Sequence, residues 1–325
     1  MMTLFERTEM VKQCARNLGF SAVGITSAEP LGEEFVQYQE WLRREYHGGT
    51  EGAMQYMERH LDKRGDVRSI LPSAQSIIVV AQNYYTPCMH EKNVPDTGGK
   101  ISRYAWGDDY HEVIPPKLRL LCDAVRECDP DSETKVYTDT GAIMEKAYAV
   151  RAGIGWQGKH SNVIHRGIGS WFFIGVIITS TQFLYDTPHD DFCGTCTACI
   201  GACPTQAIVE PYLVDARRCI SYWTIETKPQ HEIPPAIAES MDEWLFGCDT
   251  CQDVCPWNRF QTPTQEEAFM PRNNETRLMF QRIETYSQEE FSRRFRKSPL
   301  KRTKLAGLRR NARALQQSKN VSSPQ

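Results

Sequence analysis

The sequence lacks the segments that would carry a protein into or across a membrane. Its first 13 residues mix acidic and basic side chains with short apolar pairs, without the basic region and apolar run of a signal peptide. The longest apolar run, residues 171–179, is far shorter than the ~20 residues that a membrane span needs. We therefore expect a cytoplasmic protein with no membrane partner.

The chain also lacks an overall excess of basic residues, since its formal net charge is −3. The charges are unevenly distributed, however, because residues 293–313 contain ten Lys or Arg and no Asp or Glu. Leu305, Leu308, Ala312 and Leu315 recur there at helical spacing. An uncompensated basic helix favours phosphate groups of nucleic acid, and the alternative is an ordinary solvated helix face.

No internal repeat of solenoid length occurs, and strands and helices alternate in the first part of the chain, which indicates an α/β layer structure. We expect strands at 21–25, 76–82, 135–137 and 171–179, and helices at 5–19, 33–44, 52–63, 113–128 and 143–152. The composition changes near 185 and again after 262. We therefore divide the chain into an α/β domain at 1–184, a cysteine-rich domain at 185–262, a basic helical segment at 263–315 and a disordered tail at 316–325.

Twelve cysteines stand out in a sequence without an export signal. In a reducing compartment, ligation of a metal or cluster is a better explanation for clustered cysteines than disulfide bonding. Eight of them fall between residues 193 and 255. The scattered cysteines are not expected to be ligands; they are Cys14, Cys88, Cys122 and Cys128.

The cysteine spacing predicts two [4Fe–4S] clusters. Residues 193–204 read C-x2-C-x2-C-x3-C-P, the bacterial ferredoxin run whose fourth cysteine reaches the other cluster. Residues 248–256 repeat the pattern with one cysteine fewer, and Cys219 can supply the missing ligand. We assign cluster one to Cys193, Cys196, Cys199 and Cys255, and cluster two to Cys203, Cys219, Cys248 and Cys251.

Two alternatives to this assignment remain at this stage. Pairs of C-x2-C also suit structural zinc, although the C-x3-C-P endings argue against it. Cys219 can instead be a buried core cysteine, which is a common place for a free thiol. Two clusters imply one-electron relay to an acceptor in the first ~180 residues, a domain-sized stretch.

Two short motifs in that stretch have ordinary interpretations. Residues 153–158 match G-x-G-x-x-G, but they follow a helical stretch and precede a loop and a strand, the reverse of a dinucleotide-binding context. A turn or a close backbone approach explains the glycines better. Asp139 lies between a short strand and a helix, where it can cap the helix or act as a general acid beside a cofactor cavity.

Taken together, these segments resemble the epoxyqueuosine reductase family. The resemblance rests on YTDTGAIMEKAYAVRAGIGWQGKHSNVI (137–164), GSWFFIGVI (169–177), the two cysteine runs with CISYWTIE (219–226) between them, and SPLKRTKLAGLRRNA (298–312), in this order. It implies an α/β (α+β) cobalamin-binding domain related to reductive dehalogenases, a bacterial-type two-cluster ferredoxin domain and a short C-terminal helical segment. It also implies reduction of epoxyqueuosine to queuosine at the wobble position of tRNA, the last step of queuosine biosynthesis.

The resemblance further implies the roles of individual residues. Asp139 would be the proton donor to the epoxide oxygen. The basic run would bind the tRNA anticodon stem-loop through Lys301, Arg302, Lys304, Arg309 and Arg310. The residues near cobalamin would be Arg59, Arg64, Ser102, Asp139, Lys159, His160, Ser161, Asn162, Ser170, Ser221, Tyr222 and Trp223.

Other functions and partners stay open. The main alternatives are a corrinoid reductive dehalogenase-like enzyme and a dicluster electron carrier without an active site. For the reductase we expect a monomer that receives electrons from a flavodoxin, a ferredoxin or a similar protein.

Overall fold

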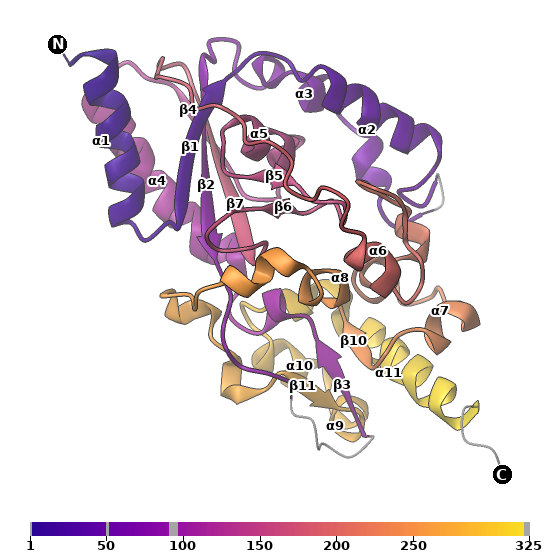
Figure 1. The fold of residues 1–325 in the computed structure, drawn as a ribbon. Helices are drawn as coiled ribbons and strands as arrows, with labels where there is room; N and C mark the ends of the chain where they lie inside the picture. Colours follow the sequence, from indigo (N-terminus) through magenta and orange to yellow (C-terminus); the bar gives the residue numbers. More distant parts are fainter. Residues whose placement is uncertain (1, 50–51, 91–96, 322–325) are drawn as a thin grey trace.

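The computed structural model describes residues 2–49, 52–90 and 97–321, and its N-terminal part is built on a four-stranded sheet (Figure 1). The strand order is β1-β2-β7-β4, and every neighbouring pair is antiparallel. The predicted strands are therefore all present. Their bounds are β1 Ala22–Ser27, β2 Ser76–Asn83, β4 Thr134–Tyr137 and β7 Phe172–Thr179.

Helices cover both faces of this sheet, which is why β2 is buried along its whole length. Ile78 and Val80 pack in one core with residues of α1 and α4, whereas Ile77 and Val79 pack in another with residues of α5. This division follows from the alternation of side chains along a strand. The helices around the sheet are α1 Leu4–Asn17, α2 Glu33–Arg43, α3 Leu61–Gly65, α4 Tyr110–Cys128 and α5 Glu145–Arg151.

Three predicted helices differ in extent from those observed. Segment 52–63 is a 3₁₀ turn, η1 (Gln55–Glu58), followed by α3, because His60 has a left-handed φ of 55° that interrupts a helix. Helix α4 begins three residues early, since the Asp109 carboxylate caps it by accepting the His111 backbone N–H. Helix α5 begins at Glu145, so Asp139 lies too far upstream to cap it.

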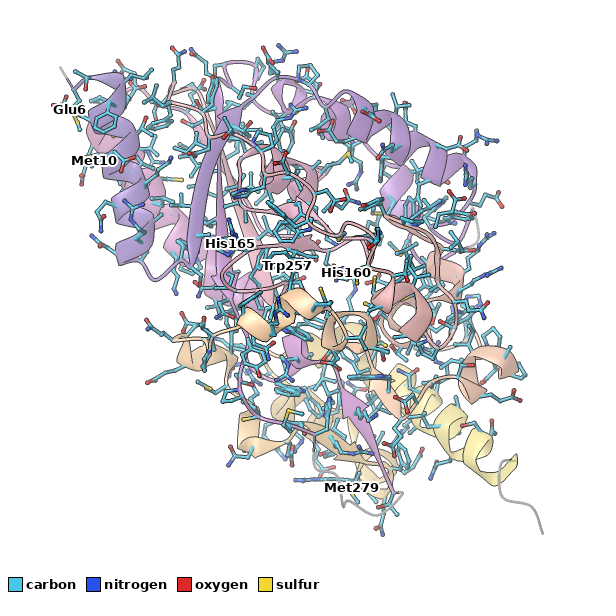
Figure 2. All side chains as sticks on the ribbon, in the orientation of Figure 1. Glu6, Met10, His160, His165, Trp257 and Met279 are labelled. Atoms are coloured by element: carbon cyan, nitrogen blue, oxygen red, sulfur yellow. The ribbon has the colours of Figure 1, made fainter. Side chains whose placement is uncertain are left out.

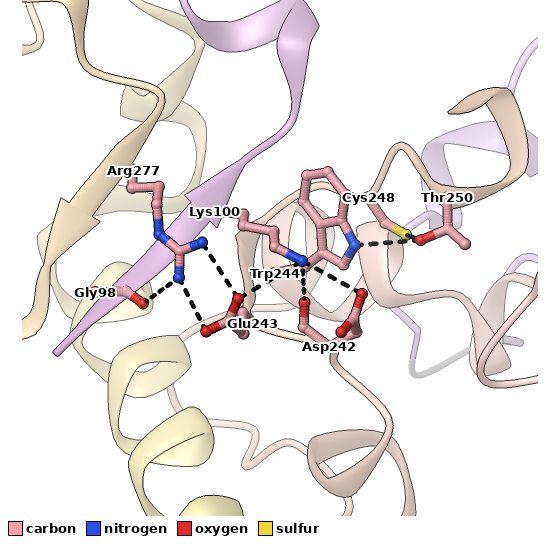
Figure 3. Close-up of polar contacts among 8 residues, drawn as sticks. All are labelled: Gly98, Lys100, Asp242, Glu243, Trp244, Cys248, Thr250 and Arg277. Carbon is pink, nitrogen blue, oxygen red and sulfur yellow. Dashed lines mark hydrogen bonds and ion pairs between the residues drawn. The ribbon is translucent and has the colours of Figure 1, made fainter. Parts of the chain in front are cut away.

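A second sheet joins distant parts of the chain. Strand β3 (Gly98–Ile101) lies between β10 (Trp244–Phe246), which is parallel to it, and β11 (Arg277–Met279), which is antiparallel. Figure 3 shows Arg277 paired with Glu243 at 3.0 Å and Lys100 donating to the Asp242 carbonyl at 3.1 Å. Ile101, Ala105 and Trp106, which lie within the predicted 1–184 domain, pack in a third core with residues from the later part of the chain, so the division at 184 does not separate the hydrophobic cores.

The cysteine-rich segment consists of short elements packed against one another. Helices α6 (Ala198–Ala202) and α8 (Thr250–Asp253) contact each other and are drawn between the two sheets in Figure 1. A hairpin of β8 (Ile208–Glu210) and β9 (Leu213–Val214) follows α6. A further small hairpin, β5 (Trp156–Gln157) with β6 (Val163–Ile164), carries the loop of residues 158–162.

The C-terminal part is helical and completes the hydrophobic core around the second sheet. Helix α11 (Lys304–Val321) packs against α7 (Pro235–Glu239), α9 (Phe280–Thr285) and β10, and α10 (Gln288–Arg294) precedes it in sequence. Residues 316–321 are thus helical and not disordered as predicted, because they continue a helix already anchored in the core, and 322–325 lie outside the described residues. No helix in the described part of the chain has the length and apolarity of a membrane span.

Candidate active site

The four cysteines assigned to cluster one line a single cavity of about 210 Å³; they are Cys193, Cys196, Cys199 and Cys255. Lys159 closes one side of this cavity. Its ammonium group donates to the carbonyls of Gly194 and Cys196, at 2.5 and 3.0 Å, and so fixes the loop that carries the first cysteines. The structure therefore brings together cysteines that are more than 50 residues apart in sequence.

The four cysteines assigned to cluster two lie together on a larger cavity of about 460 Å³; they are Cys203, Cys219, Cys248 and Cys251. Within the described residues, no three His, Cys, Asp or Glu side chains are gathered closely enough for one metal ion. Each set of four is instead spaced around a volume. Figure 3 shows the support of Cys248, whose sulfur lies 3.3 Å from Thr250 Oγ1, while Trp244 Nε1 donates to the same oxygen at 3.2 Å.

His160 lies between the two cavities and lines both. Figure 2 places it in the middle of the molecule, and Trp257, also labelled there, lines the first cavity. His160 Nδ1 accepts the Asn162 backbone N–H at 3.2 Å, and Nε2 has no partner. Burial, with a contribution from Lys146, lowers the pKa of His160 to about 4, so the ring is neutral at neutral pH.

The scattered cysteines are absent from the lining of both cavities. Cys122 packs inside the core between α1, α4 and the sheet, and Cys14 and Cys128 flank that core. Cys88 packs against the core formed around the second sheet and the C-terminal helices. These four cysteines thus lie apart from the two sets that line the cavities.

Asp139 lies at the edge of the larger cavity, on the loop between β4 and α5. Its φ of 54° is left-handed, a conformation that Asp tolerates better than most residues. Two contacts hold it: the Tyr110 hydroxyl donates to Oδ2 at 2.5 Å, and the Asp139 backbone N–H donates to Glu145 Oε1 at 2.7 Å. The Asp139 carboxylate is thus oriented by a tyrosine, and its backbone is held by a second carboxyl group.

Glu145 also lines the larger cavity. Burial raises the pKa of Glu145 to about 8, and the charge of Asp139 adds to that rise, so this carboxyl group is largely protonated at neutral pH. The next residue, Lys146, donates to the Asn162 side chain at 2.9 Å and to the Ser161 carbonyl at 3.2 Å. Helix α5 therefore connects the Asp139 loop with the 158–162 loop.

About half of the residues predicted to meet cobalamin line the larger cavity; they are Ser102, Asp139, His160, Ser161, Asn162 and Ser221. Ser102 is buried there and its hydroxyl donates to Asp249. Ser161 has a left-handed φ of 66° at the turn of the 158–162 loop. These residues follow strands β3 and β4, lie on the β5–β6 hairpin or belong to the cysteine-rich segment, and these parts of the chain meet at this cavity.

The others are absent from that lining and make contacts elsewhere. Arg64 is buried and donates to the Tyr56 and Arg59 carbonyls, while Arg59 is exposed. Lys159 belongs to the first cavity, because its ammonium group is bound to carbonyls there.

The remaining three stabilise neighbouring backbone or side chains. Ser170 donates to Gln252 Oε1 at 2.9 Å and so positions a side chain that does line the cavity. The Tyr222 hydroxyl accepts the Ala53 N–H, and Trp223 Nε1 donates to the Arg217 carbonyl.

Several residues that line the cavity cannot be recognised from sequence patterns. Tyr104 and Tyr110 come from the segment around the start of α4, and their hydroxyls have raised pKa values because burial disfavours the phenolate. Phe172 and Phe173 begin β7, where a sequence pattern reads them as sheet core. Only Glu145 had a usable signal, since it lies six residues after Asp139 and so close to it in the fold.

The basic run is split between internal and exposed side chains. Lys301, Arg302 and Lys304 are exposed, and Arg302 pairs with Glu226 at 2.8 Å. Arg310 is only 1% exposed. Its guanidinium group donates to carbonyls of the 223–231 segment, which is why it cannot meet tRNA as predicted.

Arg309 is half-buried and is also used within the fold. It donates to the Glu284 and Tyr286 carbonyls at 2.8 Å, at the end of α9. The exposed set lies on the 3₁₀ turn η9 (Pro299–Thr303) and the residue after it. This turn packs against the π-helical turn η5 (Tyr222–Glu226), where Ile225 lines the larger cavity.

Comparisons with known proteins agree with this geometry. Residues 64–140 match the family model described as Epoxyqueuosine reductase QueG, DUF1730, and residues 192–258 match the 4Fe-4S double cluster binding domain. An epoxyqueuosine reductase of Cellulophaga algicola is 44% identical over 96% of this chain and 98% of its own length. One from Synechocystis sp. is 46% identical over 91% of this chain and 99% of its own.

Solved structures of the same family superpose closely. A crystal structure of epoxyqueuosine reductase with an epoxyqueuosine-modified tRNA-Tyr stem loop has a TM-score of 0.88 and 30% identity, over 96% of this chain and 81% of that one. The Bacillus subtilis enzyme, with its catalytic aspartate loop swung out of the active site, has a TM-score of 0.86 at 30% identity over 96% and 82%. The chain therefore belongs to the epoxyqueuosine reductase family.

Proposed function

We propose that this protein is an oxidoreductase that reduces epoxyqueuosine to queuosine at the wobble position of tRNA. The observation that carries the proposal is one cavity with Asp139 at its edge and four cysteines in its wall, next to a second cavity with four more. An acid and a source of electrons that face the same space are what reductive removal of an epoxide oxygen needs. The reductases that it resembles, including one crystallised with the modified stem loop, support the choice of substrate.

The cysteines fit two [4Fe–4S] clusters with the partition predicted from the spacing. Burial raises the pKa of the Cys248 thiol to about 12 and that of Cys251 well above its usual value. A thiolate in such a place needs a cation beside it, which cluster iron supplies. We therefore assign Cys193, Cys196, Cys199 and Cys255 to cluster one, and Cys203, Cys219, Cys248 and Cys251 to cluster two.

The larger cavity fits a corrinoid by the chemistry of its lining. Aromatic and aliphatic side chains such as Phe172, Ile208 and Ile220 offer apolar contact, and Ser102, Ser161 and Asn162 offer polar partners at its edges. The buried His160 Nε2 lacks a partner beside the same space. When bound, cobalamin supplies the strongly reducing cobalt centre for C–O cleavage, and the clusters supply its electrons one at a time.

The chain's own residues handle the proton. Asp139 gives its proton to the epoxide oxygen, which would otherwise leave as a poor alkoxide. The Tyr110 hydroxyl donates to Asp139 Oδ2 and so stabilises the carboxylate that remains. Glu145 holds the backbone of the loop through the Asp139 N–H and keeps the side chain directed to the cavity.

The exposed basic side chains contact the phosphates of the anticodon stem-loop. Lys301 and Arg302 lie on η9, which packs against the η5 turn that borders the cavity. Phosphate contacts at that place would hold the stem-loop while the wobble base leaves the anticodon stack and enters the cavity.

We further propose that the protein acts as a cytoplasmic monomer that receives electrons from a flavodoxin, a ferredoxin or a similar one-electron carrier. Cys196 is exposed, so cluster one would be the cluster nearer to such a donor. Cluster two borders the cavity with Asp139 and would be the one that passes electrons on.

The proposed function is tested by single-turnover reduction of an epoxyqueuosine-containing stem-loop by reconstituted protein under a chemical reductant. An anaerobic ultraviolet–visible spectrum of the same sample reports the clusters and the bound corrinoid. We expect both cofactors and formation of queuosine. A protein with clusters but no corrinoid would be an electron carrier, and one that removes halide from an aryl halide but leaves the stem-loop unchanged would be a dehalogenase.

A further inference from the structure

The chemistry of the proposed reaction requires more protons than Asp139 holds. Reduction of an epoxide to an alkene breaks two C–O bonds, forms one C=C bond and releases the oxygen as water. The reaction consumes two electrons and two protons, and the electrons come from the external one-electron donor through the clusters. Asp139 carries a single proton, so it must be reprotonated within each turnover by a neighbouring group or by solvent.

His111 lies where such a group would have to be. Its Nε2 is 4.0 Å from Asp139 Oδ2, and its Nδ1 is 2.7 Å from Asp109 Oδ1. The imidazole is thus placed between two carboxylates, one at the start of α4 and one on the loop after β4. The His111 side chain is 35% exposed, so its ring also meets solvent.

The surroundings fix this ring in place. It stacks on the Tyr110 ring at 4.1 Å between centroids, and Tyr110 stacks in turn on Phe173 at 4.3 Å. Asp109 has a lowered pKa, since its hydrogen bonds to His111 outweigh the effect of burial, and Arg272 adds to the lowering. Asp109 therefore stays ionised and favours a proton on Nδ1, which directs Nε2 towards Asp139.

We propose that His111, oriented by Asp109, carries protons from solvent to Asp139. The inference rests on the proposed function, because it concerns the acid of that reaction. In the first step Asp139 protonates the epoxide oxygen as one C–O bond breaks. The imidazolium then gives its Nε2 proton to the Asp139 carboxylate and recovers a proton from solvent. Asp139 gives this second proton to the same oxygen as the other C–O bond breaks, and water leaves.

The geometry favours His111 over its neighbours for this task. The 4.0 Å separation closes to a hydrogen bond with a side-chain movement of ~1 Å, or is bridged by one water. Tyr110 is already bonded to Asp139, but burial and the Asp139 charge raise the pKa of its hydroxyl, so it keeps its proton. Glu145 holds one proton beside the loop but touches Asp139 through the backbone N–H and not through the carboxylate.

The test uses His111→Gln and His111→Ala in the cluster- and cobalamin-loaded protein, with His189→Gln as a control for an exposed histidine that lines neither cavity. Gln keeps a donor for Asp109 but cannot carry a proton. We expect His111→Gln to bind cobalamin, iron and the stem-loop as the parent does, and to reduce epoxyqueuosine roughly 10²-fold more slowly at neutral pH. The deficit should shrink as the pH falls, and added imidazole should speed His111→Ala but not the parent.

The same residues allow a double-mutant cycle. If His111 acts through Asp139, His111→Gln costs little more once Asp139 is Asn, because the group that it reloads is gone. Additive losses, a Gln variant as fast as the parent, or an Ala variant that imidazole does not accelerate would overturn the inference. If the parent itself fails to form queuosine, the proposed function is wrong and this inference falls with it. An active parent with unaffected His111 variants removes the inference alone.

Discussion

Replacement of Asp139 by Asn separates the chemical role of this residue from its structural role. Asn tolerates the left-handed φ of 54° as well as Asp does, and its side-chain oxygen can still accept the Tyr110 hydroxyl. The backbone N–H that bonds Glu145 is unchanged by the substitution. We therefore expect Asp139→Asn to fold and to load both cofactors like the parent protein.

The loss should appear in the reaction rate alone. An amide cannot give a proton at neutral pH, and general acid catalysis typically contributes ~10²–10⁴-fold, which equals about 3–5 kcal/mol of the activation barrier. Asp139→Ala should show the same chemical defect together with about 1 kcal/mol of lost stability, since Ala is strained at this φ.

The assay is single-turnover reduction of the modified stem-loop with a chemical reductant, which avoids dependence on the natural electron donor. Stem-loop affinity and thermal unfolding of the same samples provide the controls. If Asp139→Asn forms queuosine within a few-fold of the parent rate, Asp139 is not the acid, and water or Glu145 must supply the proton.

Three other predictions concern the clusters, the basic surface and Glu145. The iron content should approach eight atoms per chain, as two four-iron clusters require. Cys219→Ala should lose or degrade one cluster, whereas the control Cys122→Ala should keep the full iron content. If the iron content of Cys219→Ala is unchanged, the partition is wrong. Replacing Lys301, Arg302 and Lys304 together by Gln should weaken stem-loop binding and reduce its salt dependence by roughly one log unit per lost phosphate contact, measured by titration at several salt concentrations. Arg310→Met should instead leave that salt dependence unchanged and lower the free energy of unfolding by ~3 kcal/mol or more, because several buried carbonyls lose their donor. The pKa of Glu145 is raised from 4.5 to about 8, so its contribution to stability is present below the lower value and is lost as the pH rises through about 8. Cobalamin-free Glu145→Gln should therefore lose less thermal stability than the parent over that pH range, and parallel curves for the two proteins would contradict this account.

The sequence predicts local features of this protein well. The spacing of Cys193, Cys196 and Cys199 indicates a cluster because these cysteines are separated by only two residues each. The strands at 76–82 and 171–179 are recognisable because the central sheet is covered on both faces and its strands are continuously apolar.

Features that depend on distant contacts were harder to predict. Arg309, Arg310 and the exposed basic residues look alike in sequence, and only the packing of α11 against the 223–231 segment makes Arg310 internal. The aromatic residues that line the cavity cannot be recognised from the sequence for the same reason. Tyr110 begins helix α4 and Phe173 lies at the start of strand β7, and nothing local shows that both face a cofactor cavity.

The position of β3 has a consequence for how the protein can be assembled during synthesis. Strand β3 is made early, but both of its partners, β10 and β11, lie well over 100 residues later in the chain. The residues on either side of Cys248 are tied to the same early segment, since Phe246 accepts the Ser102 N–H and Asp249 accepts the Arg103 N–H. A nascent chain released only as far as residue 240 would hold β3 unpaired and would lack three of the eight cluster cysteines. Loading of both clusters must therefore follow translation at least as far as Cys255, and a fragment of residues 185–262 expressed alone would lack the strand that supports its own cluster loop.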